Sequence, residues 1–196
     1  GVFRMEQRLT REQLGYLLKL ARMTIAERLG VHCGEPVSGH SDGEGVLMEK
    51  APTFVTLTEQ GRLRGCIGSL EAREPIVESI RRNALNAAFR DPRFPPVRPD
   101  ELDRITIEVS VLSEPRHLDY EGPGDLLSKL TPGVDGVIIS KGYHSATFLP
   151  QVWEQLPDKE EFLTHLCMKA GLPGDEWRKG DLDVMTYRVQ SLEEED

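Results

Sequence analysis

The sequence predicts an α+β fold with a mainly antiparallel sheet flanked by helices. Residues 105–112 alternate strictly between apolar and polar side chains, as in a strand with one buried face. Residues 53–68 contain two β-rich arms around Gln60 and Gly61, which is typical of a hairpin. Helical patterns stand apart from these strands instead of alternating with them, which favours an antiparallel sheet over a parallel one.

Three segments have the periodicity of amphipathic helices. The first covers residues 10–29 and begins with a capping box formed by Thr10 and Gln13. The second covers residues 75–91, between a proline at its start and another just after its end. The third covers residues 158–171, with an aspartate cap at its start and a glycine at its end.

Further strands are expected in the second half of the chain. Residues 137–140 and 145–149 form an expected antiparallel pair joined through Gly142, and residues 184–189 form a last short strand. Residues 31–52 are rich in glycine and proline, which indicates an extended excursion. We expect one domain over residues 1–196, with a smaller lobe around this excursion and the neighbouring helices.

Composition and charge restrict the classes of function. The net charge of -9, from 33 acidic and 24 basic residues, argues against nucleic-acid binding, and no apolar run approaches the ~20 residues that cross a membrane. Three widely spaced cysteines fit neither a disulfide framework nor a paired metal site, and no secretory signal is visible, so we expect a cytoplasmic protein. The acidic run over residues 193–196 is expected to be a solvated, frayed tail.

The segment from Gly61 to Ser69 concentrates unusual residues inside a predicted strand. Its three glycines each cost about 0.5 to 1 kcal/mol relative to alanine, so they indicate a bulge, a positive φ or the close approach of a ligand. Arg64 offers a planar fork for a carboxylate or phosphate, and its charge would favour a thiolate at Cys66. The structural alternative is that glycines shape a bulge, Cys66 is a small buried residue and Arg64 pairs with a surface acid.

The hexapeptide Leu63-Arg64-Gly65-Cys66-Ile67-Gly68 resembles the signature of the AMMECR family, whose prokaryotic members are called AmmeMemoRadiSam system protein A. Four further segments resemble family segments in family order, so that the resemblance covers nearly the whole chain. They are residues 91–96, 107–113, 146–153 and 162–171.

The resemblance implies a two-lobed α+β fold with a cleft between the lobes, lined by the signature loop. It implies neither a settled activity nor a particular cofactor. Prokaryotic members are associated with a Memo-like protein, itself similar to non-haem metal dioxygenases, and with a radical S-adenosylmethionine enzyme. This association suggests a shared modification pathway, with a small-molecule or peptide ligand in the cleft.

Other polar residues are candidates for the same site. Asp91 and Arg93 lie on a proline-stiffened elbow, where they either contact a ligand or form an internal ion pair. Glu108 projects from the polar face of its strand, toward either solvent or the cleft. His144 lies in a turn from which it could approach Cys66, with Glu108 orienting the resulting Cys-His pair.

Residues 147–153 run from a strand into a helix start, where free backbone N–H groups can receive an anion. Phe148, Gln151 and Trp153 are therefore candidate binding residues, although aromatic residues more often belong to the core. His32, Cys33 and His40 share the excursion but lack the spacing of metal ligands, so no metal site is predicted.

The leading hypothesis is a cytoplasmic component of a pathway that modifies a small molecule or peptide. In it, Arg64 with Gly65 and Gly68 binds an anionic group, and Cys66 acts as a thiolate or as a wall of the pocket. The alternative is a non-catalytic protein-binding or adaptor module that uses the same cleft. Residue types alone leave open whether the protein is an enzyme.

Overall fold

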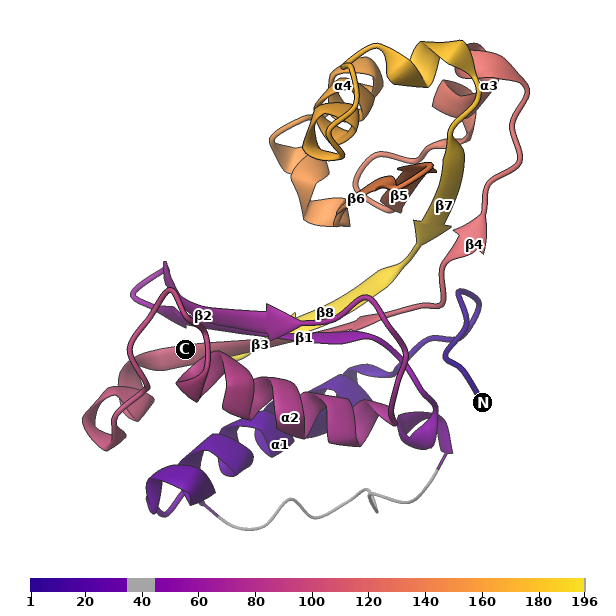
Figure 1. The fold of residues 1–196 in the computed structure, drawn as a ribbon. Coiled ribbons are helices and arrows are strands. Elements are labelled where there is room, and N and C mark those ends of the chain that lie inside the picture. The colour runs from indigo at the N-terminus through magenta and orange to yellow at the C-terminus, as the bar shows by residue number, and fades with distance from the viewer. Residues whose placement is uncertain (35–44, 196) are drawn as a thin grey trace. The chain divides into compact units, whose positions relative to one another are not determined.

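The computed structural model describes residues 1–34 and 45–195, which form two compact units (Figure 1). Unit 1 comprises Gly1–Glu114 and Gln190–Asp196, and unit 2 comprises Pro115–Val189. Within the described residues each unit has a four-stranded sheet and a hydrophobic core of its own. The fold is α+β with antiparallel strand pairing, as predicted.

Unit 1 packs two helices on one face of its sheet. Its elements are α1 (Arg11–Leu29), η1 (Gly45–Met48), β1 (Thr53–Glu59), β2 (Arg62–Gly68), α2 (Ile76–Phe89), η2 (Pro99–Arg104), β3 (Ile105–Leu112) and β8 (Val189–Glu193). The strand order is β2-β1-β3-β8, so β2 and β8 are the edge strands. Helix α1 contacts β3, and α2 contacts β1 and β2 (Figure 1).

The two faces of the unit 1 sheet have different chemistry. Val55 and Leu57 of β1 are fully buried, and Asn83 of α2 donates to Thr53 Oγ1 at 2.9 Å, so odd-numbered residues of β1 face the helices. The alternate residues Thr56 and Thr58 point to the opposite side, because successive side chains of a strand alternate. We call this opposite side, which also carries Thr106, Glu108 and Ser110 of β3, the polar face.

Several local predictions for unit 1 are confirmed. Thr10 caps α1 and forms the reciprocal capping box with Gln13, and Gly30 ends the helix in the left-handed conformation. The β1–β2 hairpin turns at Gln60 and Gly61, whose φ angles are 52° and 75°. Two consecutive positive φ values match the right-handed twist of the flanking strands.

Unit 2 packs short helices around a smaller sheet. Its elements are β4 (Arg116–His117), α3 (Gly122–Lys129), β5 (Gly136–Lys141), β6 (His144–Phe148), η3 (Pro150–Glu154), α4 (Lys159–Lys169), η4 (Glu176–Lys179) and β7 (Asp183–Tyr187). The strand order is β4-β7-β5-β6. Asp158 caps α4 by accepting from Glu161 N–H at 2.9 Å, as predicted, and the β5–β6 pair turns at Gly142.

Some boundaries differ from the prediction. The strand expected over residues 184–189 is found as β7, which ends at Tyr187, and a further strand, β8, begins at Val189 and belongs to the unit 1 sheet. Helix α2 ends at Phe89, earlier than expected, and Asp91, which lies beyond its end, accepts a hydrogen bond from the edge of β2. Helix α3 begins with glycine and proline and was not predicted, since such residues usually indicate a loop.

The acidic run is not simply a solvated tail. The side chain of Glu194 is half-buried, and its backbone N–H donates to Ile107 O at 3.0 Å. Its carboxylate accepts from Arg22 at 2.6 and 2.7 Å, so an ion pair and a strand contact hold it in unit 1. Asp196 lies outside the described residues.

The smaller lobe expected around residues 31–52 stays a prediction, since residues 35–44 lie outside the described part of the chain. No helix that the structure describes has the length and apolar character needed to span a membrane.

Candidate functional site

The strand that carries the signature residues contains a β-bulge. Leu63 and Cys66 both lie opposite threonines of the polar face, so two residues, Arg64 and Gly65, occupy the place of one. Both of these residues are buried, and Gly65 lies opposite the core residue Leu57. The bulge therefore turns Arg64 to the helix side of the sheet and Cys66 to the polar face.

Arg64 pairs with an acid of the neighbouring 3₁₀ helix. Its Nε and Nη2 atoms donate to the two carboxylate oxygens of Glu101 at 3.2 and 3.3 Å, and the residue is only 8% exposed. Its Nη1 atom is buried and has no hydrogen-bond partner among the described residues. The structure thus brings Arg64 to Glu101 and separates its guanidinium group from the Cys66 thiol.

Close packing explains two of the three glycines. A Cβ atom on Gly65 would lie 2.2 Å from the backbone oxygen of Ala87 in α2. A Cβ atom on Gly68 would lie 2.3 Å from the ring of Phe54 and 2.4 Å from Thr53 O. Neither position admits a side chain, so these glycines let β2 approach its neighbours, and they need no ligand to account for them.

The Asp91–Arg93 elbow clamps the backbone of Cys66. The Cys66 N–H donates to Asp91 Oδ2 at 3.0 Å, and Arg93 Nη2 donates to Cys66 O at 3.3 Å. Arg93 also pairs with both carboxylate oxygens of Asp91 at 3.0 and 2.8 Å. These two side chains occupy the outer edge of β2 at Cys66, where another chain could otherwise pair.

The Asp91 carboxylate and the Arg93 guanidinium group of the elbow stabilise each other's charged forms. Hydrogen bonds from the Arg93 side chain, from Cys66 N–H and from Arg93 N–H hold the pKa of the buried Asp91 carboxyl well below its usual range. The ion pair that was the structural alternative for Asp91 and Arg93 is present, with Arg93 Nη2 2.8 Å from Asp91 Oδ2. Arg93, and not Arg64, is the cation in direct contact with Cys66.

Cys66 begins a row of three side chains across the polar face. Thr56 lies directly opposite both Cys66 of β2 and Glu108 of β3, so all three point the same way. The Cys66 Sγ and Thr56 Oγ1 atoms are 3.4 Å apart. Phe54 and Leu63, an exposed apolar residue, lie in the adjacent rows.

Glu108 contributes a carboxylate to this row. It is half-buried, and neither a hydrogen-bond nor an ion-pair partner is found for it in residues 1–34 and 45–195. Burial, together with the negative charge of Glu193, raises the pKa of the Glu108 carboxyl. The folded state therefore disfavours the charged form of this acid, and perturbed acids of this kind are common at functional sites.

The remaining candidate residues belong to unit 2. His144 is exposed, and its Nδ1 atom lies 3.0 Å from Ala170 O. Trp153 is buried and stacks on Phe162 with a centroid distance of 3.6 Å, and Phe148 meets the same ring edge-on. These two aromatic residues thus serve the unit 2 core, Gln151 is exposed on η3, and the Cys66–His144 pair stays a prediction.

Among the described residues, no group of three or more His, Cys, Asp and Glu side chains is placed to hold a metal ion. His32 and Cys33 lie in the described part of the excursion, and His40 lies outside the described residues.

Two contributors to the site were missed by sequence reasoning. Thr56 could have been found by aligning the two arms of the hairpin, but only with the correct register across the bulge. No local sequence pattern indicated that Glu101 belongs to the site, because its contact with Arg64 joins residues far apart in the sequence.

The chain is similar to proteins that have no established activity. The AMMECR1 family model matches residues 18–192. A protein of Methanothermobacter thermautotrophicus is 41% identical over 188 residues, covering 95% of this chain and 97% of that protein. A protein of Methanopyrus kandleri is 40% identical, covering 98% of this chain and 93% of that protein.

The same similarity extends to a solved structure. The crystal structure of an uncharacterized protein from Pyrococcus horikoshii superimposes with a TM-score of 0.78. The two chains are 38% identical, and the match covers 95% of this chain and 94% of that one.

Proposed function

The chain belongs to the AMMECR1 family, which confirms the resemblance, and on that premise we propose that it is a cytoplasmic component of a modification pathway. The pathway would include Memo-like and radical S-adenosylmethionine proteins. The substrate is a small molecule or peptide that binds to the polar face of unit 1.

One observation carries this proposal, namely the half-buried Glu108 carboxylate, which has no partner among the described residues and lies in the same row as the Cys66 thiol. An acid whose pKa is raised by burial can hold or release a proton near neutral pH more readily than an exposed acid. Partial burial disfavours the charged form of Glu108, and no ion pair within the described residues offsets that effect.

The residues of the row have distinct roles in the proposal. Glu108 transfers a proton to or from the bound substrate, and Cys66 acts as nucleophile or as a contact to the reacting group. Asp91 and Arg93 are positioning residues, because they bind the backbone of Cys66 and leave its side chain free to face the substrate. Arg64 shapes the bulge through its pair with Glu101.

The test reconstitutes the chain with Memo-like and radical S-adenosylmethionine proteins from one organism and follows modified products by mass spectrometry. We expect Cys66→Ser and Glu108→Gln to abolish product formation. Cys33→Ser is the matched control, since Cys33 is also a half-buried free thiol but lies away from the polar face, and it should retain activity.

A second measurement separates catalysis from an adaptor role. If the complex of the three proteins forms and product still appears with both Cys66→Ser and Glu108→Gln, the polar face is not catalytic and the chain is an adaptor. An Arg64→Ala variant that loses the complex would then show that the bulge is required for partner binding.

A further inference from the structure

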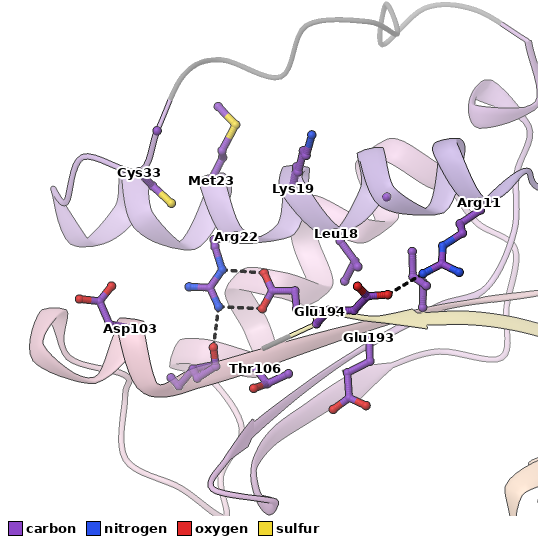
Figure 2. Close-up of a pocket in the computed structure, with 15 residues that line it drawn as sticks. Arg11, Leu18, Lys19, Arg22, Met23, Cys33, Asp103, Thr106, Glu193 and Glu194 are labelled. Atoms are coloured by element: carbon purple, nitrogen blue, oxygen red, sulfur yellow. Dashed lines mark hydrogen bonds and ion pairs between the residues drawn. The ribbon is translucent and has the colours of Figure 1, made fainter.

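The polar face of the unit 1 sheet carries a second carboxylate beside Glu108. Leu192 of β8 packs against the core of unit 1, so the next residue, Glu193, points to the opposite side of the sheet. Figure 2 shows the side chains of Glu193 and Thr106 on the side that faces away from α1. The charge of Glu193 acts on Glu108, so the two acids lie near each other on this face.

No lysine or arginine of the four described strands of unit 1 faces the same side. The basic residues of these strands are Arg62 and Arg64 of β2. Arg62 lies opposite Glu59, an odd-numbered residue of β1, and Arg64 is buried, so both belong to the helix side. At the outer edge of β2, Arg93 already pairs with both carboxylate oxygens of Asp91. The strands therefore present negative charge on the polar face.

A bound cation would relieve two unfavourable effects at Glu108. Burial and the charge of Glu193 both raise the pKa of the Glu108 carboxyl, which means that both disfavour its charged form. Neither a hydrogen bond nor an ion pair is found for this carboxylate in residues 1–34 and 45–195. A positive group between the two acids would supply a partner and reduce their repulsion.

The groups around Glu108 fit an ammonium ion. Thr56 lies directly opposite Glu108, and Thr106 and Ser110 flank it on the same face of β3. Their hydroxyl oxygens can accept hydrogen bonds, and an ammonium group has three N–H donors and no acceptor. A metal ion fits less well, since no group of three or more His, Cys, Asp and Glu side chains is placed to hold one in the described part of the chain.

The position of Cys66 restricts the shape of such a ligand. Cys66 and Glu108 lie on the two strands that flank β1, with Thr56 between them. Two strand spacings separate their backbones by about 10 Å. A molecule with its ammonium group at Glu108 must therefore extend over β1 by a few bonds to place another group at Cys66 Sγ.

We propose that the substrate of the polar face is a primary amine, bound as its ammonium ion by the carboxylates of Glu108 and Glu193, with its reacting group at Cys66. This inference rests on the proposed function, because it names the substrate class of the same face. The Thr56 hydroxyl lies between the two ends of the substrate. The carboxylate that transfers a proton in the proposed function then lies next to an N–H group.

The test compares the rates at which charged methanethiosulfonates label Cys66 in a Cys33→Ser chain, whose other thiol, Cys167, is fully buried. Each reagent transfers its alkylthio group to the thiolate and releases methanesulfinate, so the ratio of two rates cancels the reactivity of the thiol itself. Relative to a small free thiol, the 2-aminoethyl reagent should be favoured about tenfold over the 2-sulfonatoethyl reagent. Glu108→Gln and Glu193→Gln should each reduce this preference several-fold, as should raised salt.

A second cation separates recognition of an ammonium group from attraction of charge alone. The 2-(trimethylammonio)ethyl reagent has the same charge but no N–H donor, so it should label Cys66 several-fold more slowly than the aminoethyl reagent, again relative to a free thiol. Cys33, measured in a Cys66→Ser chain, is the matched control, because it is also half-buried but interacts with the charge of Arg22. Its preference should be much weaker, and Glu108→Gln should leave it unchanged.

The labelled protein tests the pairing directly. In the Cys33→Ser chain, an aminoethyl label on Cys66 should raise the melting temperature at pH 7 by about 2 °C relative to a neutral hydroxyethyl label of the same length, because its ammonium group pairs with Glu108. This difference should disappear in Glu108→Gln. It should persist in Glu114→Gln, which removes an exposed carboxylate elsewhere in unit 1.

Any one of three results overturns the inference. The first is a Cys66 preference for the aminoethyl reagent no greater than that of a free thiol, or one that persists in both glutamine variants. The second is equal labelling by the trimethylammonio reagent, and the third is an equal melting temperature with the two neutral and cationic labels. These measurements use the purified chain, so such a failure leaves reconstitution of the pathway as a separate test of the proposed function.

Discussion

At the scale of single residues, the unit 1 site combines two carboxylates in different environments. Asp91 has charged and backbone hydrogen-bond donors around it, whereas Glu108 is half-buried with no such donors in the described part of the chain. Their pKa values accordingly shift in opposite directions. Opposite dependences of stability on pH follow from these two shifts.

Asp91→Asn should lower the free energy of unfolding by about 1.5 to 3 kcal/mol at pH 7, as expected for lost hydrogen bonds to a charged group. Because the pKa of Asp91 is lowered in the folded state, its contribution is complete above about pH 4 and is lost as the pH falls further. Denaturant unfolding between pH 3 and pH 7 measures this. A difference between variant and wild type that stays constant over this range would contradict it.

Glu108→Gln should have the opposite effect on stability. Because the folded state raises the pKa of Glu108, the charged carboxylate destabilises the protein at pH 7, and this penalty disappears as the acid is protonated at low pH. The variant should be more stable by roughly 1 kcal/mol at pH 7 and equal to wild type below about pH 4. In Glu114→Gln, a control with an exposed side chain, stability should change little at either pH.

A gain of stability together with a loss of product would identify Glu108 as a residue kept for function. Loss of stability on Glu108→Gln at pH 7 would instead mean that its carboxylate has a structural partner.

At the scale of elements, the position of the Cys66 thiol depends on how β2 meets its neighbours. Because the bulge adds one residue, the side chains before and after it no longer follow a single alternation between the two faces of the sheet. The close contact of Gly65 with α2 keeps the bulged strand near that helix. The elbow after α2 then binds the outer edge of β2. Helix α2 and its following elbow thus position the strand from two sides.

Gly65→Ala should separate β2 from α2, because the added methyl group collides with the backbone of Ala87. We expect a loss of about 1 to 3 kcal/mol in the free energy of unfolding, as for an overpacked core. Gly15→Ala is the matched control in the same unit, and it should raise stability by up to about 1 kcal/mol. Equal effects of the two substitutions would exclude close packing as the reason for Gly65.

At the scale of the whole molecule, unit 2 is a continuous insertion into the chain of unit 1. Arg116 of β4 pairs with Thr186 of β7, so the chain enters and leaves unit 2 through neighbouring strands. Its core is separate and includes both tryptophans of the chain, Trp153 and Trp177. A unit with its own core and adjacent ends is expected to fold by itself.

Residues 115–189 expressed alone should therefore fold cooperatively, with circular dichroism and tryptophan fluorescence changing together on heating. In the full chain, tryptophan fluorescence reports on unit 2 alone, whereas far-ultraviolet circular dichroism reports on both units. Gly65→Ala should shift the dichroism transition of unit 1. The fragment of residues 115–189 does not contain this position, so its transition is the reference for unit 2. Failure of the fragment to fold would show that its core depends on unit 1.

Local chemistry was sufficient to predict much of this protein. The cap of α1, the hairpin turn at Gln60 and Gly61 and the alternation of β3 all depend on residues close in sequence, and each is confirmed. The segment of the candidate site was also recognisable, because glycines are unusual in a strand. The family of the chain followed from its motifs.

Only the tertiary structure decided which side chains share a face. Arg64 and Cys66 are two positions apart and were expected to act together, but the bulge in the β1–β2 pair places them on opposite sides of the sheet. Glu108 joins Cys66 only through the register of three strands, and Arg93 reaches it only because α2 ends beside β2. Strand register and edge contacts depend on partners distant in sequence, and the local pattern of residues does not specify them.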